Sequence, residues 1–250
     1  MIFVTGDIHG DPSRFNSHDF PGQKEMTKDD YLIVLGDFGL VWDYEGENRT
    51  EKWWLDWLND KPFTTLFIDG NHECFDRLYK YPVKEWNGGK VHEIRPSVLH
   101  LMRGEIFNLN GKTIFAFGGA SSHDVWDGIL DPVEDAKLIK KWRHDYTKVF
   151  RIKGISWWKE ELPTDEEMDW GEENLKRHGK SVDFILSHTP SASIIAMLGH
   201  GRYEQDVLTN YLEDVKCNTE YTRMFSGHMH MDKQINDKDI LLYKQIVRIV

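Results

Sequence analysis

The sequence predicts an α/β fold, because short buried strands alternate with helices that have one apolar face. A glycine or a Ser-His pair follows each apolar run within two residues, which is typical of strands that end in tight polar loops. Amphipathic stretches between these runs, at 51–59 and 205–215, are predicted helices. In such folds ligands bind at the carboxyl ends of the strands. The predicted strands are residues 2–4, 31–35, 66–68, 114–117, 182–186 and 223–225.

The chain length fits a single domain, residues 1–250, but one segment of it differs from the rest. Between about 121 and 180 the charges are mixed, and the segment contains Trp142, Trp157 and Trp158. We expect this segment to form an insertion or cap on the domain. If the cap exposes Trp157 and Trp158, these side chains would offer a surface for a dimer or a partner.

Two further stretches are assigned to the core and to a sheet edge. Helix 51–59 contains Trp53, Trp54 and Trp57, which we expect to pack in the core and not to stack on bases. The runs at 240–243 and 246–250 are predicted closing strands, paired as a hairpin at a sheet edge.

Composition argues against several classes of partner. The formal net charge of −11 disfavours a general affinity for nucleic acid or for anionic membranes, although a local basic pocket stays possible. Cys74 and Cys217 form no Cys-x-x-Cys pair, which fits a reducing compartment. No segment has the pattern of a signal peptide or about 18 consecutive apolar residues. We therefore expect a cytoplasmic protein without membrane contacts.

Side chains that commonly bind metals follow most of the predicted strands. In the Asp-x-His and His-x-His pairs the two donors would point to the same side of an extended backbone. Glycines before the motifs allow the backbone to turn sharply. Mixed oxygen and imidazole donors suit Mn²⁺, Fe²⁺ and Zn²⁺, and the absence of thiolates disfavours a structural zinc site. The predicted ligands are Asp7, His9, Asp37, Asn71, His188, His228 and His230.

This ordered set, D-x-H, G-D, G-N-H-E, a lone His and G-H-x-H, resembles the calcineurin-like metallophosphoesterase superfamily from Asp7 to His230. The resemblance implies a four-layered α/β/β/α sandwich, in which two mixed sheets are flanked by helices, as in metallo-dependent phosphatases. Residues 118–124 and 155–163 are also similar to a subgroup of bacterial and phage members.

The resemblance also implies roles for individual residues. Two divalent cations are expected, Mn²⁺ in the first place and Fe or Zn as alternatives. A metal-bound hydroxide would attack the phosphorus, His72 would stabilise the transition state or protonate the leaving oxygen, and Glu73 would orient His72 or a ligand. Asp37 is expected to bridge the ions. The implied ligand sets are Asp7, His9, Asp37 and His230 for one metal, and Asp37, Asn71, His188 and His228 for the other.

One departure from the superfamily bears on the substrate. The residues after Asp37, 38–41, lack the Asp-Arg pair that protein Ser/Thr phosphatases carry there, so protein phosphatase activity is disfavoured. Any cationic clamp must come from elsewhere, and His123, Arg143 and Arg151 are the candidates. The expected substrate is a small phosphorylated compound or a nucleotide, as monoester or diester.

Two alternatives to this function stay open. Within the enzyme class, the chain would be a nuclease or a cyclic-nucleotide phosphodiesterase. In a different class, it would be a non-catalytic binding module that uses the metal pocket as a docking surface. Six further histidines are expected to be ordinary surface or core residues, namely His18, His92, His100, His144, His178 and His200.

Overall fold

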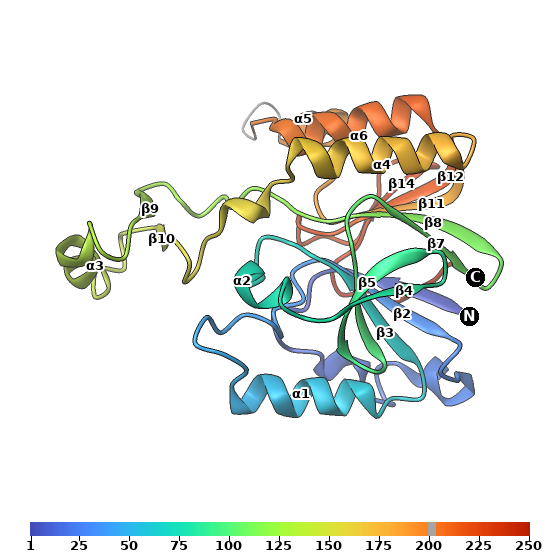
Figure 1. Cartoon of the computed structure of the whole chain (residues 1–250), viewed down its shortest axis with the longest axis horizontal. Coiled ribbons are helices and arrows are strands. Elements are labelled where there is room, and N and C mark those ends of the chain that lie inside the picture. The colour runs from blue at the N-terminus through green and yellow to red at the C-terminus, as the bar shows by residue number, and fades with distance from the viewer. Residues whose placement is uncertain (200–203) are drawn as a thin grey trace.

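The computed structural model describes residues 1–199 and 204–250, and His200 lies outside the described residues. Figure 1 shows two β-sheets stacked face to face between two outer layers of helix. Helix α1 (Arg49–Asn59) covers the outer face of the first sheet. Helices α4 (Asp165–Arg177), α5 (Ala192–Gly199) and α6 (Val207–Asn218) lie over the second sheet. This architecture confirms the predicted four-layered α/β/β/α sandwich.

The first sheet is mixed, and its order among the described residues is β15-β1-β2-β3-β6-β5-β4. Strands β1, β2, β3 and β6 are parallel to one another, whereas β15, β5 and β4 join antiparallel. The carboxyl ends of β1, β2 and β3 therefore meet at one edge. The strands are β1 (Ile2–Thr5), β2 (Tyr31–Leu35), β3 (Thr64–Ile68), β4 (Val83–Trp86), β5 (Gly89–Arg95), β6 (Val98–Leu101) and β15 (Val247–Arg248).

The second sheet has the order β13-β14-β12-β11-β8-β7 within the described residues and is also mixed. Its central strands β8, β11, β12 and β14 are parallel, and the edge strands β7 and β13 are antiparallel. The strands are β7 (Glu105–Leu109), β8 (Lys112–Phe117), β11 (Ser181–Ser187), β12 (Glu220–Ser226), β13 (Lys233–Gln234) and β14 (Asp239–Leu241).

The expected hairpin of the closing runs 240–243 and 246–250 is wrong. Strand β14 pairs with β12 in the second sheet, and β15 pairs with β1 in the first. The backbone N–H of Leu242 donates to the carbonyl of Ser226, which continues the second sheet to the point where the chain leaves it. Each run finds a free sheet edge, so the end of the chain joins the two sheets and does not pair with itself.

Strand β2 illustrates why these sequences form buried strands. All five of its residues are buried, and successive side chains point to opposite faces of the sheet. Leu32 and Val34 pack in the cluster beneath α1, whereas Ile33 and Leu35 pack in the cluster between the two sheets. A third cluster lies under α4 and α6. Three apolar layers thus separate four layers of secondary structure, which explains the continuous apolar runs of the sequence.

The short helices complete the sandwich. Helices α1, α4 and α6 each begin with a capping box, in which the N-cap side chain and the third helical residue bond each other's backbone N–H. None of the helices in the described parts of the chain has the length and apolar character that crossing a bilayer requires. The remaining short helices are α2 (Phe75–Leu78), η1 (Ser13–Phe15), η2 (Pro21–Glu25) and η3 (Lys159–Glu161).

Residues 128–155, called the arm below, project from the layered body at the left of Figure 1. The arm contains β9 (Gly128–Leu130), α3 (Ala136–Trp142) and β10 (Phe150–Ile152), with β9 and β10 paired in parallel. It has a small core of its own. The segment expected as an insertion, about 121–180, also contains α4, which packs on the second sheet through Leu175. The division of the chain into domains stays a prediction.

Trp158, just after the arm, is buried against the body of the domain and is not available as a partner surface. Only 4% of the residue is exposed, and it packs with the cluster beneath the first sheet. Its indole Nε1–H donates to Asp76 Oδ2 at 3.0 Å. Trp157 is half-buried, and the exposed tryptophan of the projecting segment is Trp126. The expectation that Trp157 and Trp158 together form an exposed surface is therefore wrong for Trp158.

We expect Trp158→Phe to lower the free energy of unfolding by roughly 1–3 kcal/mol, because it removes buried volume and the bond to Asp76. Trp126→Phe changes an exposed ring and should stay within about 0.5 kcal/mol of the wild type. Urea denaturation of both variants measures the difference. Equal effects at the two positions would contradict the anchoring role of Trp158.

Candidate metal centre

Five strand ends deliver the predicted ligands to one place. Strands β1, β2 and β3 of the first sheet are followed by Asp7 and His9, by Asp37, and by Asn71. Strands β11 and β12 of the second sheet are followed by His188 and by the pair His228 and His230. Both sets of strands are parallel, and their carboxyl ends face each other across the sandwich. Side chains between positions 7 and 230 are thereby brought together.

The ligand atoms form two neighbouring groups with Asp37 between them. In the first group, His230 Nε2 lies 3.1 Å from Asp7 Oδ2 and 2.9 Å from His9 Nε2. In the second, His188 Nε2 lies 3.3 Å from Asp37 Oδ1. The other oxygen of Asp37 lies 3.8 Å from His9 Nδ1, toward the first group. The clusters that could hold a metal ion include Asp7-His9-His230 and Asp37-His188-His228.

Within residues 1–199 and 204–250, three buried atoms of this centre meet no hydrogen-bond partner of suitable geometry. They are Asp7 Oδ2, Asn71 Oδ1 and His188 Nε2, and each belongs to a predicted ligand. Leaving a buried polar atom unsatisfied costs about 1–3 kcal/mol. Divalent cations would satisfy all three atoms, because carboxylate oxygens, amide oxygens and imidazole nitrogens are their usual ligands. The donor set therefore fits the predicted metals.

The other atoms of these side chains are fixed by hydrogen bonds. The backbone N–H of His228 donates to Asp7 Oδ1 at 3.0 Å, and that of His72 donates to Asp37 Oδ1 at 2.8 Å. His188 Nδ1 lies 2.7 Å from the carbonyl of Leu35, to which it donates a hydrogen bond. Once Nε2 loses its proton to a cation, this bond keeps the remaining proton on Nδ1 and leaves Nε2 as the donor atom to the metal, the arrangement that metal-binding histidines use.

The backbone at the centre is strained. His9, Asp37, His228 and His230 have φ angles of 45°, 45°, 63° and 48°, which lie in the left-handed region. Residues other than glycine rarely occupy this region, and when they do they cluster at functional sites. Four of the seven predicted ligands thus carry a conformation that the surrounding structure must enforce.

Two glycines leave the space that ligand side chains fill. A Cβ atom at Gly36 would lie 2.2 Å from the ring of His188, and one at Gly70 would lie 2.1 Å from Asp37 Oδ1. No side chain fits at such distances, so both positions require glycine. This is the physical basis of the glycine before each motif.

Charge is concentrated at the centre and shifts the pKa values of its groups. Burial would raise the pKa of Asp37, but the charge of His188 and its contact with the carboxylate outweigh burial and hold this pKa well below its usual range. Burial would likewise lower the pKa of His188, but Asp37 and Asp7 raise it to about 9. Burial lowers the pKa of His228 well below its ordinary value. A cation bound at His188 Nε2 would take the place of this proton.

His72 and Arg151 lie side by side at the rim of the centre. His72 Nε2 is 4.0 Å from Asp37 Oδ2, and an Nη2–H of Arg151 donates to His72 Nε2 at 3.2 Å. Arg151 also makes two bonds to Asp124, at 2.9 and 2.6 Å. Burial and the charge of Arg151 lower the pKa of His72 although Asp37 opposes them. Arg151 belongs to β10, so the arm contributes a cation to the centre.

The other two clamp candidates have different positions. His123 Nε2 lies 2.6 Å from His228 Nε2, beside the second group of ligands. Arg143 lies on the arm, where it lines a groove with Lys140 and Ile152, and the structure does not bring it to the centre. Glu73 accepts backbone N–H bonds from Phe38 and Gly39, so it fixes the loop after Asp37 and does not touch the ring of His72.

A buried ion network behind Asn71 has no counterpart in the sequence-based prediction. Asp69 accepts bonds from Arg103 at 2.9 and 2.5 Å, and its other oxygen lies 3.1 Å from His100 Nε2. The backbone N–H of Gly119 donates to the carbonyl of Asp69. The network thus joins the end of β3 to the end of β8. His92 lies in the same buried cluster, where its Nδ1 is 3.0 Å from Nδ1 of His100. The sequence predicts both histidines to be ordinary surface or core residues.

Ser122 and Glu161 hold Asn71 from the other side. Asn71 Nδ2 donates to Ser122 Oγ at 3.3 Å, which turns Oδ1 toward the metal centre. The backbone N–H of Ser122 donates to Glu161 Oε2, while Glu161 Oε1 is buried without a partner. Burial raises the pKa of Glu161 to about 8 although its hydrogen bonds and Arg151 oppose the shift. In the sequence, the only signals for the contacts of Asp69 and Asn71 are the position of Asp69 before Gly70 and the serines Ser121 and Ser122 after residues 118–120.

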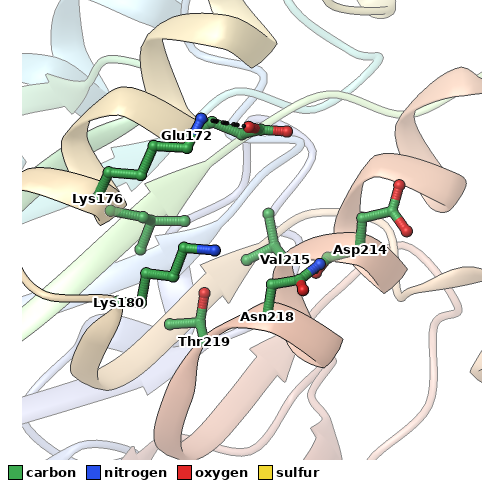
Figure 2. A pocket seen from close by; sticks show the side chains of 8 residues that line it. Glu172, Lys176, Lys180, Asp214, Val215, Asn218 and Thr219 are labelled. Carbon is green, nitrogen blue, oxygen red and sulfur yellow. Dashed lines mark hydrogen bonds and ion pairs between the residues drawn. The ribbon is translucent and has the colours of Figure 1, made fainter.

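The centre opens to solvent through a groove of about 330 Å³, lined by His72, His123, Asp124 and Met229 together with five of the predicted ligands, all but Asp7 and His188. A smaller cavity of about 160 Å³ lies between α4 and α6. Figure 2 shows this second cavity, with the ion pair of Lys176 and Glu172 on one side. None of the predicted site residues lines it. The groove at the metal centre therefore combines metal ligands with access for a substrate, and a neighbouring groove of about 630 Å³ shares His123 and His228 with it.

Asp37→Asn should greatly reduce metal binding, because it removes a carboxylate shared by both ligand groups. We expect metal analysis to show a clear loss of bound Mn²⁺, and added Mn²⁺ should raise the unfolding temperature of the wild type far more than that of the variant. Asp60→Asn, an exposed change at the end of α1, is the matched control and should bind metal normally. Equal metal content in the two variants would contradict the shared role of Asp37.

The raised pKa of Glu161 predicts a dependence of stability on pH. The folded chain binds a proton at Glu161 up to about pH 8, whereas an unfolded chain releases it near pH 4.3. This contribution to stability is complete below about pH 4.3 and is lost as the pH rises through 8. Glu161→Gln cannot ionise, so its free energy of unfolding should improve relative to wild type between about pH 5 and 9. A difference that stays constant over this range would refute the prediction.

Comparison with solved structures finds a candidate 5'-nucleotidase from Staphylococcus aureus. The match covers 97% of this chain and 48% of the other at 17% identity, with a TM-score of 0.44.

Comparison with curated proteins finds lariat debranching enzymes. The enzyme of Schizosaccharomyces pombe is 26% identical over 66% of this chain and 36% of its own length. That of Drosophila melanogaster is 27% identical over 62% of this chain and 30% of its own length. This chain spans about a third of the length of these relatives.

The family model of the calcineurin-like phosphoesterases matches residues 1–232, from the first predicted ligand to the last. The match agrees with the superfamily expected from the order of the motifs, with the four-layered fold, and with a hydrolase class that acts on phosphate esters and uses divalent metal ions. The chain therefore belongs to the calcineurin-like phosphoesterase family.

Proposed function

We propose that this chain hydrolyses a phosphomonoester or phosphodiester at a dinuclear metal centre. The observation that carries the proposal is the convergence of three unsatisfied buried atoms, Asp7 Oδ2, Asn71 Oδ1 and His188 Nε2, around Asp37. The proposed ligands are Asp7, His9, Asp37 and His230 for one cation, and Asp37, Asn71, His188 and His228 for the other.

The donor types favour Mn²⁺, with Fe²⁺ and Zn²⁺ as alternatives. Carboxylate, amide and imidazole donors occur together, which suits ions of intermediate softness. The described residues at the centre include no thiolate. When bound, the cations would supply Lewis-acid stabilisation of the phosphate charge and activation of water.

His72 and Arg151 act on the substrate in this proposal. Arg151 contacts His72 and Asp124, two residues that line the groove, and a phosphate oxygen that enters between them would accept one of its N–H groups. Such a bond would draw Arg151 away from His72 Nε2 and free that nitrogen to interact with the leaving oxygen. Asp124, which holds Arg151 in place, is a positioning residue. This pair would take the place of the arginine that protein Ser/Thr phosphatases carry after the second motif.

Catalysis is favoured over a non-catalytic docking role by the completeness of the centre. Every ligand predicted from the motifs reaches it, and His72 stands at the groove with its ring accessible. A docking module would have no need of an imidazole poised beside the bridging carboxylate. The lariat debranching enzymes among the relatives add support for a phosphodiester substrate.

The proposal predicts hydrolysis of bis-p-nitrophenyl phosphate or p-nitrophenyl phosphate by the Mn²⁺-loaded chain. Asp37→Asn and His72→Ala should each lower kcat/KM by roughly 100-fold or more, the first by loss of metal and the second by loss of the group at the leaving oxygen. Release of p-nitrophenolate measures both.

His18→Ala is the control, since His18 is exposed and outside the centre, and it should keep wild-type activity. Unchanged turnover in both Asp37→Asn and His72→Ala would refute the proposed centre. Loss of activity in His72→Ala with full metal content would separate its role from metal binding.

A further inference from the structure

The basic residues of this acidic chain are concentrated on the arm. The arm, residues 128–155, contains seven Lys and Arg side chains and four Asp and Glu side chains, a net charge of +3. The whole chain has 31 basic and 42 acidic residues, so the remainder has 24 and 38, a net charge of −14. The arm is therefore a positive element on a strongly negative body, and the net charge of −11 hides it.

Most of these cations have no carboxylate partner. Lys148 pairs with Asp127, and Arg151 pairs with Asp124. For the five others, no carboxylate of residues 1–199 or 204–250 lies within ion-pair distance of 4 Å, and all five are exposed. These unpaired cations are Lys137, Lys140, Lys141, Arg143 and Lys153. Cations on a folded surface without partners are available to bind phosphate groups.

Aromatic side chains lie among these cations. Tyr146 is 99% exposed between Arg143 and Lys148 in the sequence, and Trp126 is 87% exposed near the root of the arm. Lys148 covers the ring of Trp142 at 5.1 Å from its centroid. Cationic side chains alternating with exposed rings are the pattern by which proteins hold single-stranded nucleic acid, because the cations bind phosphates and the rings stack on bases.

One cation of the arm, Arg151, reaches the metal centre. A groove of about 500 Å³ on the arm is lined by Lys140, Arg143 and His144 together with apolar side chains that include Ile152. Arg151, the neighbour of Ile152 on β10, reaches the rim of the metal centre and contacts His72. Figure 1 shows the arm extending from the strand ends that carry the centre. A chain of phosphates bound along the arm would thus lead to the proposed catalytic groove.

We infer that the arm binds single-stranded nucleic acid and presents one of its phosphodiesters to the metal centre. The inference rests on the proposed function for the second of these steps and on the charges of the arm for the first. An anionic membrane fits less well, because Leu138, Ile139 and Trp142 of α3 pack in the arm's own small core, so this helix does not turn an apolar stripe toward a bilayer. The acidic body would repel the strand outside the arm, which would limit contact to this surface.

The test is binding of a fluorescein-labelled oligothymidylate of about 12 nucleotides, with phosphorothioate linkages to resist hydrolysis, measured by anisotropy between about 50 and 200 mM KCl. Five cations predict a slope of roughly −3.5 for log K against log salt. Lys140→Glu with Lys141→Glu should weaken binding about 10-fold or more and reduce the slope by about 1–2. Tyr146→Ala should weaken binding about 5-fold without changing the slope.

Lys24→Glu with Lys180→Glu is the matched control, because both side chains are exposed, lie outside the arm and change the net charge by the same amount. This control should bind within about 2-fold of wild type. Equal loss in the control and the arm variant would overturn the inference, as would absence of binding by the wild type. Binding to phosphatidylserine vesicles is measured alongside. If the arm variant binds these vesicles less well but binds the oligonucleotide as the wild type does, the inference is also overturned.

Hydrolysis of bis-p-nitrophenyl phosphate by the wild type, measured in parallel, separates the two proposals. If the wild type binds the oligonucleotide through the arm but cleaves no ester, the proposed function fails and the binding surface stands. If it cleaves the small ester but the arm variants bind the oligonucleotide as the wild type does, the inference fails and the proposed function stands.

Discussion

The buried carboxylate of Asp37 is the constraint on which the two-sheet architecture depends. The residue is only 2% exposed, and its oxygens face His188 from the second sheet and His9 from the first. A charged group at this depth is tolerable only with opposite charge or a cation beside it. The sheets must therefore bring the carboxyl ends of their parallel strands to the same point. Gly70 leaves room for this carboxylate, so even a single methyl group at position 70 would displace the side chain of Asp37.

The centre is unfavourable as a piece of protein structure, and the rest of the fold stabilises it. Unsatisfied buried atoms and left-handed ligand residues both raise the free energy of the folded chain. The apolar layer between the sheets and the buried pair of Asp69 and Arg103 hold the strand ends in place against this strain. Strain of this kind persists in functional sites because a bound ligand returns part of the energy, and a cation coordinated by Asp7 and His188 would do so here.

Much of the fold, and the clustering of the candidate ligands, could be predicted because their signals are local. Each candidate ligand follows the end of a strand within four residues, so the strand pattern places Asp7 and His188 near one site. Their roles as ligands stay a prediction from the resemblance. Pairings between distant positions leave no such signal, and Asp69 and Arg103, 34 residues apart, were missed for this reason. The closing strands show the same limit, since alternation predicts a strand but not the sheet it joins. Arg143 and Arg151 looked equivalent in sequence, yet only Arg151 lies on the strand that returns to the centre.

The acidic net charge disfavours long polyanions as substrates, and the distribution of charge changes the weight of that argument. Electrostatic attraction acts over roughly 8–10 Å at physiological salt, so a ligand responds to the charges near it and not to the sum over the chain. The cations of the arm lie together, and Arg151 connects them to the groove beside His72. An acidic body with one basic arm would admit a phosphate chain along the arm more readily than over the rest of the surface. The net charge that disfavours a general affinity for nucleic acid would then select the direction from which it enters.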